Sequence, residues 1–411
     1  MALAQNVDMT PTTHAAPVPG PILHARLDEE RFARLRLARS QNVGPRTYSH
    51  LIRRFGSAQN ALDALPELAA RGGRAGYTAC PLSAIEDELD AALKADAHMF
   101  QIGDPGYPAL LAQIDPVPPI LWIRGNVDLA ARNTIGIVGA RNASALGLRT
   151  ARRIARELGT KDHVIVSGLA RGIDAAAHEA SLETGTIAVL AGGMDQPYPP
   201  ENLHLLDRIA EAGMILTEVP FGVKPTGKHF PRRNRLISGL SRGVVLIEAA
   251  ARSGSLITAR FALEQGREAM ACPGAPEDPR AAGCNQLIRD GAALIRHAGD
   301  VDEALAAPRT LTFMEEGTEF EFDADFFNDG TLRDDYDALT DFDEEGGGHG
   351  EEAIAEQIMG LLGPQPVEID EIARQCGLTA QELSLPILEL DLAGRIEIRP
   401  GGMIQRLDTN Y

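Results

Sequence analysis

Residues 134–138 read Thr134-Ile-Gly-Ile-Val138, a short apolar run that is followed by a glycine-containing turn and by a helical pattern over about residues 145–158. The same alternation of apolar run, turn and helix continues to residue 272. Its further apolar runs lie at residues 163–167, 186–191, 214–218, 243–248 and 268–272. Short buried runs separated by helices predict a parallel sheet that is covered on both faces. We therefore expect an α/β fold with a doubly wound, mostly parallel, Rossmann-like sheet.

The rest of the chain divides by composition and periodicity. We expect a disordered tail over 1–24, a small helical domain over 25–99, and the sheet domain over 100–306, led by an extended segment with one strand at 120–124. Residues 307–351 lack periodicity and form an acidic linker. Residues 352–411 show helices followed by two short strands around Pro400-Gly-Gly402, a pattern typical of a winged helix.

The helical domain contains a short break at Gln41-Asn-Val-Gly-Pro-Arg-Thr47, after which apolar helical spacing resumes at Tyr48, Leu51 and Phe55. Two helices joined by such a turn resemble a helix-hairpin-helix, in which backbone N–H groups of the turn face a DNA phosphate. The alternative is a structural helix pair with a basic, solvated face.

The net charge of −19 is concentrated in one segment, because residues 315–352 hold 16 acidic residues and one basic residue. The charge of the whole chain therefore does not exclude a nucleic-acid partner for the folded parts. No apolar run approaches the roughly 20 residues of a membrane helix, and the N-terminus lacks a secretory pattern. We expect a cytoplasmic protein with no membrane contact. Its cysteines (Cys80, Cys272, Cys284 and Cys376) form no metal-binding spacing and are expected to be reduced.

The turn after residue 138 reads Gly139-Ala-Arg-Asn-Ala-Ser144 and lacks the dinucleotide-binding pattern of glycines. Arg141 stands where a second glycine would let a pyrophosphate approach the backbone. The next run ends at Ser167-Gly168, with no acid for a ribose. The sequence therefore argues against a dinucleotide cofactor. It favours an anion site built from a helix N-terminus and a guanidinium, with an exposed loop arginine as the alternative.

The loop after residue 218 is the strongest candidate for a binding site, because residues 219–247 contain six basic residues and no acid. Lys228, Arg233 and Arg235 suit phosphates, whereas Phe230 and His229 offer flat faces on which unpaired bases stack. Asn234 suits a base edge. This pattern predicts binding of single-stranded nucleic acid, and a solvated basic loop is the alternative.

The run at 243–248 ends in Glu248 and leads to Ser253-Gly254-Ser255, a second candidate turn for an anion. A single acid at a strand end also occurs in nucleotide-cleaving enzymes of this fold, so a nucleotide-binding hydrolase remains the alternative function. The sequence shows no convincing acid/base pair. A pure interaction scaffold is a third possibility.

Several of these strings together resemble the DNA-processing protein A family (DprA, also called Smf). They are spread in order over the sheet domain and include Ile137-Val-Gly-Ala-Arg141, Ser167-Gly-Leu-Ala-Arg-Gly-Ile-Asp174, Gly193-Met-Asp-Gln-Pro-Tyr-Pro199, Phe230-Pro-Arg-Arg-Asn-Arg235, Ser253-Gly-Ser-Leu-Ile-Thr-Ala259 and Gly283-Cys-Asn-Gln-Leu-Ile288. The N-terminal module resembles the SAM-like domain of many members, and the C-terminal module resembles their winged helix.

The resemblance implies a non-enzymatic, cytosolic protein that binds single-stranded DNA. Such a protein protects incoming DNA during natural transformation and helps to load the RecA recombinase. The resemblance also implies a homodimer through the sheet domain, and no cofactor or metal. Phosphate contacts carry over onto Arg141, the Ser167-Gly168 turn and Lys228, and base stacking onto Phe230. Arg233 and Arg235 either contact DNA or brace the pocket.

Two features depart from that family pattern. The acidic segment combines carboxylates with aromatic residues, so it is either a plain tether or a mimic of single-stranded DNA that occupies the basic groove. The expected recognition segment of the winged helix carries Glu382, Glu389 and Asp391, which repel phosphates. We therefore expect protein contact there rather than duplex binding.

Overall fold

The computed structural model describes residues 28–307, 351–362, 366–399 and 402–407. The expected tail over 1–24 lies outside these ranges, and so does the acidic segment apart from its first and last residues. The hypothesis that this segment mimics DNA therefore concerns residues that the structure does not describe. Among the helices that the structure describes, none is long and apolar enough to cross a membrane.

The N-terminal part is helical, as the sequence predicts. It contains α1 (Glu29–Ala38), α2 (Pro45–Phe55), α3 (Ala58–Arg71) and α4 (Leu82–Lys94). The break between α1 and α2 follows from Gly44 and Pro45, because a proline suits the first turn of a helix but not its interior. Ser57 begins α3 by accepting a hydrogen bond from the Asn60 N–H. The core of this helix group includes Leu37, Tyr48, Leu51, Leu62 and Leu65.

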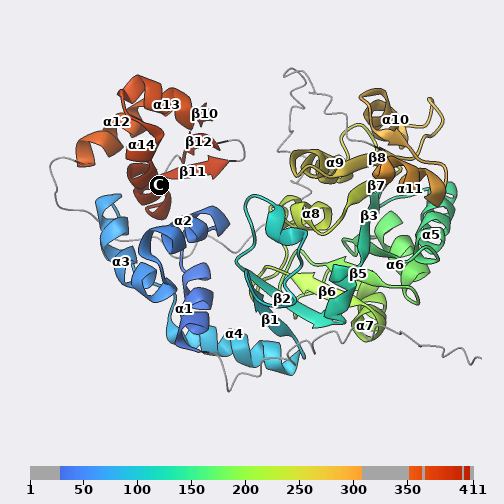
Figure 1. The fold of residues 1–411 in the computed structure, drawn as a ribbon, viewed down its shortest axis with the longest axis horizontal. Coiled ribbons are helices and arrows are strands. Elements are labelled where there is room, and N and C mark those ends of the chain that lie inside the picture. Colours follow the sequence, from blue (N-terminus) through green and yellow to red (C-terminus); the bar gives the residue numbers. More distant parts are fainter. Residues whose placement is uncertain (1–27, 308–350, 363–365, 400–401, 408–411) are drawn as a thin grey trace, which may run out of the picture.

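A nine-stranded sheet forms the middle of the chain (Figure 1). Its strands are β1 (His98–Gln101), β2 (Ile120–Gly125), β3 (Asn133–Gly139), β4 (His163–Ser167), β5 (Thr186–Val189), β6 (Met214–Thr217), β7 (Gly243–Ile247), β8 (Glu268–Ala271) and β9 (Ala293–Leu294). The order is β1-β2-β6-β5-β4-β3-β7-β8-β9, and all pairs from β6 to β9 are parallel. The sheet is doubly wound, because the chain moves from β3 outward to β6 and then returns to the other side of β3.

Two strands differ from the sequence-based expectation. Residues 98–101 form the edge strand β1, antiparallel to β2, although the helical domain was expected to reach residue 99. Alternate side chains of β1 are buried, and this period-two pattern is too short to recognise in the sequence. The two-residue strand β9 has too few residues to show any pattern.

Helices cover both faces of the sheet. One face carries α5 (Ala145–Gly159), α6 (Ile173–Ser181), α7 (Leu203–Ala212) and α11 (Ala298–Ala306), and the other carries α8 (His229–Gly239), α9 (Gly254–Glu264) and α10 (Ala282–Arg289). Successive strand residues point to opposite faces: Ile135 and Ile137 pack toward α5 and α6, whereas Val138 packs toward α8 and α9. Apolar side chains on both faces explain why the strand sequences read as continuous apolar runs.

The C-terminal residues form a winged helix of α12 (Glu351–Leu361), β10 (Val367–Glu368), α13 (Ile369–Cys376), α14 (Ala380–Leu392), β11 (Ile396–Arg399) and β12 (Met403–Arg406). A reciprocal capping box between Thr379 and Glu382 begins α14. Glu382, one of the three acids that the sequence analysis placed in a recognition segment, thus serves the helix itself. Figure 1 shows this domain beside α1, α2 and α3 and apart from the sheet.

Candidate functional site

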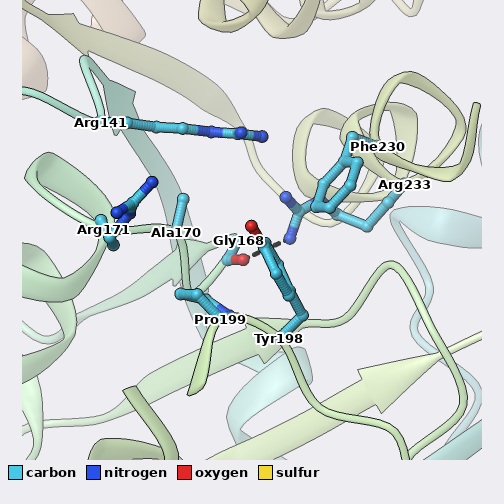
Figure 2. A pocket seen from close by; sticks show the side chains of 8 residues that line it. All are labelled: Arg141, Gly168, Ala170, Arg171, Tyr198, Pro199, Phe230 and Arg233. Atoms are coloured by element: carbon cyan, nitrogen blue, oxygen red, sulfur yellow. Dashed lines mark hydrogen bonds between the residues drawn. The ribbon is translucent and has the colours of Figure 1, made fainter. Parts of the chain in front are cut away.

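A hollow lies at the carboxyl edge of the sheet, where the turns after four neighbouring strands, β3 to β6, meet (Figure 2). Ligands of doubly wound sheets bind at this edge. The hollow is shallow and partly open to solvent, and it combines arginine side chains with two aromatic rings. Its lining residues are Arg141, Gly168, Ala170, Arg171, Tyr198, Pro199, Phe230 and Arg233.

Arg141 and Phe230 face one another across this hollow. The guanidinium carbon of Arg141 lies 5.1 Å from the centre of the Phe230 ring, within the range of a cation–π contact. Tyr198 meets the same ring edge-on, with ring centres 5.7 Å apart and an interplanar angle of 67°. Figure 2 shows Arg141 reaching over the hollow from the opposite side to Tyr198. The site therefore displays a positive charge and an aromatic face together.

Three basic residues of the segments that meet here are exposed, and one of them, Arg141, lines the hollow. Arg141, Lys228 and Arg232 are all exposed. Within the described part of the chain, no carboxylate forms an ion pair with any of the three. Arg171 is paired only loosely, at 3.5 Å from Glu201, with both side chains largely exposed. Unneutralised cations of this kind attract a polyanion, and the attraction weakens with salt.

The basic segment that the sequence analysis interpreted as a loop contains the helix α8, which begins at His229. Lys228 is the residue directly before this helix, and Phe230 is the second residue of the helix. Because Phe230 contacts Arg141, the two segments predicted to converge lie at the same edge of the sheet. Helical periodicity also separates the arginines: Arg232 is exposed, whereas Arg233 and Arg235 are 6% and 8% exposed.

Arg233 braces the floor of the hollow. Its Nη1 donates hydrogen bonds to the carbonyl oxygens of Gly168 and Val189, which join α8 to the ends of β4 and β5. Burial lowers the pKa of Arg233 to about 10, and the nearby Asp174 carboxylate opposes this shift. The guanidinium therefore stays charged at neutral pH. A Cβ atom at Gly168 would lie 2.4 Å from Arg233 Nη1, so only glycine permits this close approach.

The Ser167-Gly168 turn is held from within the protein rather than left open to a ligand. The Ser167 hydroxyl donates to the Ile137 carbonyl at 2.6 Å and is fully buried. The Gly168 N–H donates to the buried Asp174 carboxylate at 3.1 Å, and the Ala170 N–H donates to the same oxygen at 3.4 Å. Gly168 lines the hollow, and its backbone N–H and the Ser167 hydroxyl both have hydrogen-bond partners within the protein.

Arg235 and Asn234 are not presented to the hollow. Arg235 forms an ion pair with Glu218 and donates to the Pro116 carbonyl at 2.8 Å, so it ties α8 to the extended segment before β2. Asn234 Oδ1 accepts from Arg233 Nε at 3.2 Å, and its Nδ2 donates to the Gly254 carbonyl at 3.3 Å. In the structure both Arg233 and Arg235 make bracing contacts, and Asn234 takes part in them.

Neither Glu248 nor the second candidate turn lines the hollow. Glu248 accepts hydrogen bonds from the N–H and the hydroxyl of Ser144, so its carboxylate supports the N-terminus of α5. Ser253 begins α9 by accepting from the Ser255 N–H at 3.4 Å, and Gly254 is exposed beside it. The Glu248 carboxylate therefore stabilises the turn that carries Arg141.

Sequence reasoning did not single out Tyr198 and Arg171, which the structure places at the hollow. Both lie inside strings quoted for the family resemblance, but neither stands out by charge density or spacing. Tyr198 follows β5 in a proline-rich turn, and nothing in the sequence shows that this turn reaches α8. Only the order of the strands brings it there.

The fold and the site define a Rossmann-like domain with a hollow of arginine and aromatic side chains at the carboxyl edge of its sheet, flanked by a helical domain and a winged helix. Three family models match this chain: "DNA recombination-mediator protein A" over residues 98–306, "DprA-like N-terminal HHH domain" over 28–91 and "DprA winged helix domain" over 347–402. The chain therefore belongs to the DprA/Smf family of DNA-processing proteins, as the sequence motifs predicted.

Individual relatives agree with this assignment. Protein Smf of Escherichia coli is 33% identical over 332 residues, which cover 80% of this chain and 83% of the relative. DNA processing protein DprA of Bacillus subtilis is 46% identical over 211 residues, which cover 51% of this chain and 71% of the relative. The X-ray structure of DprA from Streptococcus pneumoniae aligns with a TM-score of 0.56 and 33% identity, and covers 68% of this chain and 98% of that chain.

Proposed function

We propose that this protein binds single-stranded DNA across the hollow at the carboxyl edge of the sheet. The observation that carries the proposal is the contact of Arg141 with Phe230, beside the exposed Lys228 and Arg171. Guanidinium and ammonium groups neutralise phosphates, and the partly exposed ring of Phe230 offers a stacking surface to a base. In duplex DNA the bases are already stacked, so such a ring favours a single strand.

Within this proposal the DNA contacts belong to Arg141, Lys228, Phe230 and Arg171, and Tyr198 positions the Phe230 ring. Gly168, Arg233, Asn234 and Arg235 hold the hollow in shape from beneath, and they contribute to affinity through that geometry. The Ser253–Ser255 turn lies beside α8 and would extend the path of a longer strand.

The role that follows is protection of incoming single-stranded DNA and assistance in loading the RecA recombinase during natural transformation. We further propose that the protein acts in the cytoplasm as a homodimer formed through the sheet domain. We propose binding rather than catalysis because Glu248, the acid at the end of β7, is occupied by Ser144 of the neighbouring turn. An acid in that position is poorly placed to activate water.

A titration tests the proposal directly. The anisotropy of a fluorescent oligothymidylate is measured against the protein at several salt concentrations, with a duplex of equal length alongside. We expect tight, salt-sensitive binding of the single strand and weaker binding of the duplex. Release of base or phosphate from added nucleotides would instead favour the nucleotide hydrolase, and no binding of either oligonucleotide would favour an interaction scaffold.

A further inference from the structure

The winged helix is docked on the N-terminal helices through α14. This helix has two buried sides: Leu383, Ile387 and Leu390 pack inside the winged helix itself, whereas Leu388 and Leu392 belong to the core of the helical domain. Figure 1 shows α14 against the α2 and α3 end of that domain. One helix thus contributes to two cores, and this explains why it is apolar on more than one side.

Polar contacts fix the same interface at the turn between α1 and α2. Asn42 Nδ2 donates to the Leu392 carbonyl at 2.8 Å, and the Thr47 hydroxyl donates to the Asp391 carboxylate at 2.6 Å. Arg46 donates to the Arg399 carbonyl at 2.7 Å. All three donors lie in the 41–47 turn, the segment that in a helix-hairpin-helix faces a DNA phosphate.

One ion pair crosses this interface. The carboxylate of Glu389 is 2% exposed and lies 4.0 Å from the guanidinium of Arg71 on α3. Asp391 also points into the helical domain, where it meets Thr47. DNA would be attracted to the same end of the domain, because α2 carries Arg46, Arg53 and Arg54 and no acid.

We propose that the winged helix is a protein-docking domain whose α14 binds α2 and α3 of the same chain, and that this contact competes with duplex DNA for the 41–47 turn. The second helix of a helix-turn-helix fold is the element that enters a DNA groove in many proteins. Here α14 and the turn cover one another, so a chain in this arrangement offers neither to a duplex. The inference does not depend on the proposed single-strand site, which lies on the sheet.

Gly72 provides a steric test of the docking. A Cβ atom at this position would lie 2.1 Å from the backbone oxygen of Glu389, a contact that cannot persist. The backbone of Gly72 has φ −72° and ψ 0°, which alanine adopts without strain, so Gly72→Ala leaves the helical domain itself intact. Gly360→Ala in α12 is the matched control, because nothing lies within 4 Å of its added methyl group.

The experiment uses the full chain and two measurements. Hydrogen exchange of peptides over residues 41–47 and 388–394 reports docking, and anisotropy of a fluorescent blunt duplex at low salt reports competition. We expect Gly72→Ala to increase exchange in both peptides and to tighten duplex binding several-fold. The gain in affinity has this size because it depends on the fraction of parent chains in which the winged helix is already undocked. Asp391→Lys opens the contact from the opposite side, and we expect the same pair of changes. Gly360→Ala should alter neither measurement.

Three results would contradict the proposal. Increased exchange without tighter duplex binding in both variants would refute the competition. Unchanged exchange in both variants would refute the docking itself. Protection that disappears on dilution of the parent protein would show a contact between two copies and would overturn docking within one chain.

Discussion

The guanidinium of Arg141 lies over the ring of Phe230, at 5.1 Å from its centre, although the two residues follow different strands of the sheet. Because the cation lies near one face of the ring, a base can still stack on the ring beside the charged group. Phosphate and base of one nucleotide can therefore be held together.

Removal of the Phe230 ring should weaken single-strand binding with little change in its salt dependence. Stacking on an aromatic side chain contributes roughly 1–3 kcal/mol per base, so Phe230→Ala should raise Kd by roughly five- to 150-fold. The measurement is an oligothymidylate titration at several salt concentrations. Phe230→Trp should retain most of the affinity. Wild-type affinity in Phe230→Ala would exclude stacking on this residue.

The edge contact of Tyr198 should act through Phe230. Aromatic pairs of this geometry are worth about 0.5–1.5 kcal/mol, so Tyr198→Ala should weaken single-strand binding less than Phe230→Ala does. Tyr198→Phe keeps the ring and should bind like the parent protein. In the double variant that lacks both rings, the loss of binding free energy should be smaller than the sum of the losses in the two single variants. The reason is that the Tyr198 contact has lost its partner. Full additivity would show that the two rings contact DNA independently.

Removal of the Arg233 side chain should mainly lower the free energy of unfolding, and the lost positive charge should matter less. Arg233→Met removes the hydrogen bonds to the Gly168 and Val189 carbonyls, together with the nearby charge that favours the ionised form of Asp174, and a buried group left unsatisfied costs about 1–3 kcal/mol. Urea unfolding should show this loss. Asp174→Asn in the same chain should recover part of it, since no isolated buried charge then remains. An unfolding free energy unchanged by Arg233→Met would contradict the bracing role.

The docking of the winged helix should weaken as pH rises. Burial raises the pKa of Asp391 to about 6, although the hydrogen bond from Thr47 opposes the shift, and Glu397 adds to it. A carboxyl with a raised pKa stabilises the docked state at low pH, and this contribution is lost as pH rises through about 6. The radius of gyration from X-ray scattering should therefore increase between pH 5 and pH 7.5. Asp391→Asn should remove the increase, and an equal increase in that variant would assign the pH dependence to another group.

The sequence predicted the sheet well because its physical signal is local. Six apolar runs correspond to β3–β8 within a few residues, since parallel strands buried on both faces leave a continuous apolar pattern. The motif at Arg141 and the ring of Phe230 were also identified, because a turn that lacks the usual glycines and a basic string without acids are visible in the sequence.

What the sequence could not supply was the direction of individual side chains. The sequence predicts a loop after β6, but the segment forms α8, and helical periodicity then turns Arg233 and Arg235 inward while Arg232 remains exposed. Tyr198 and Arg171 join the site only through strand order. The docking of α14 likewise depends on contacts between residues more than 300 positions apart, such as Thr47 with Asp391.

The most direct test of the account is the salt dependence of single-strand binding in Arg141→Ala and Lys228→Ala. Each lost phosphate contact should reduce the slope of log Kd against log salt by about 0.7, because fewer counterions are released. Arg208→Ala is the control, since this exposed arginine lies in the middle of α7 and is not among the residues that line the hollow. The account predicts smaller slopes and weaker binding in the first two variants and the parent slope in the control. Parent slopes in both Arg141→Ala and Lys228→Ala would contradict it.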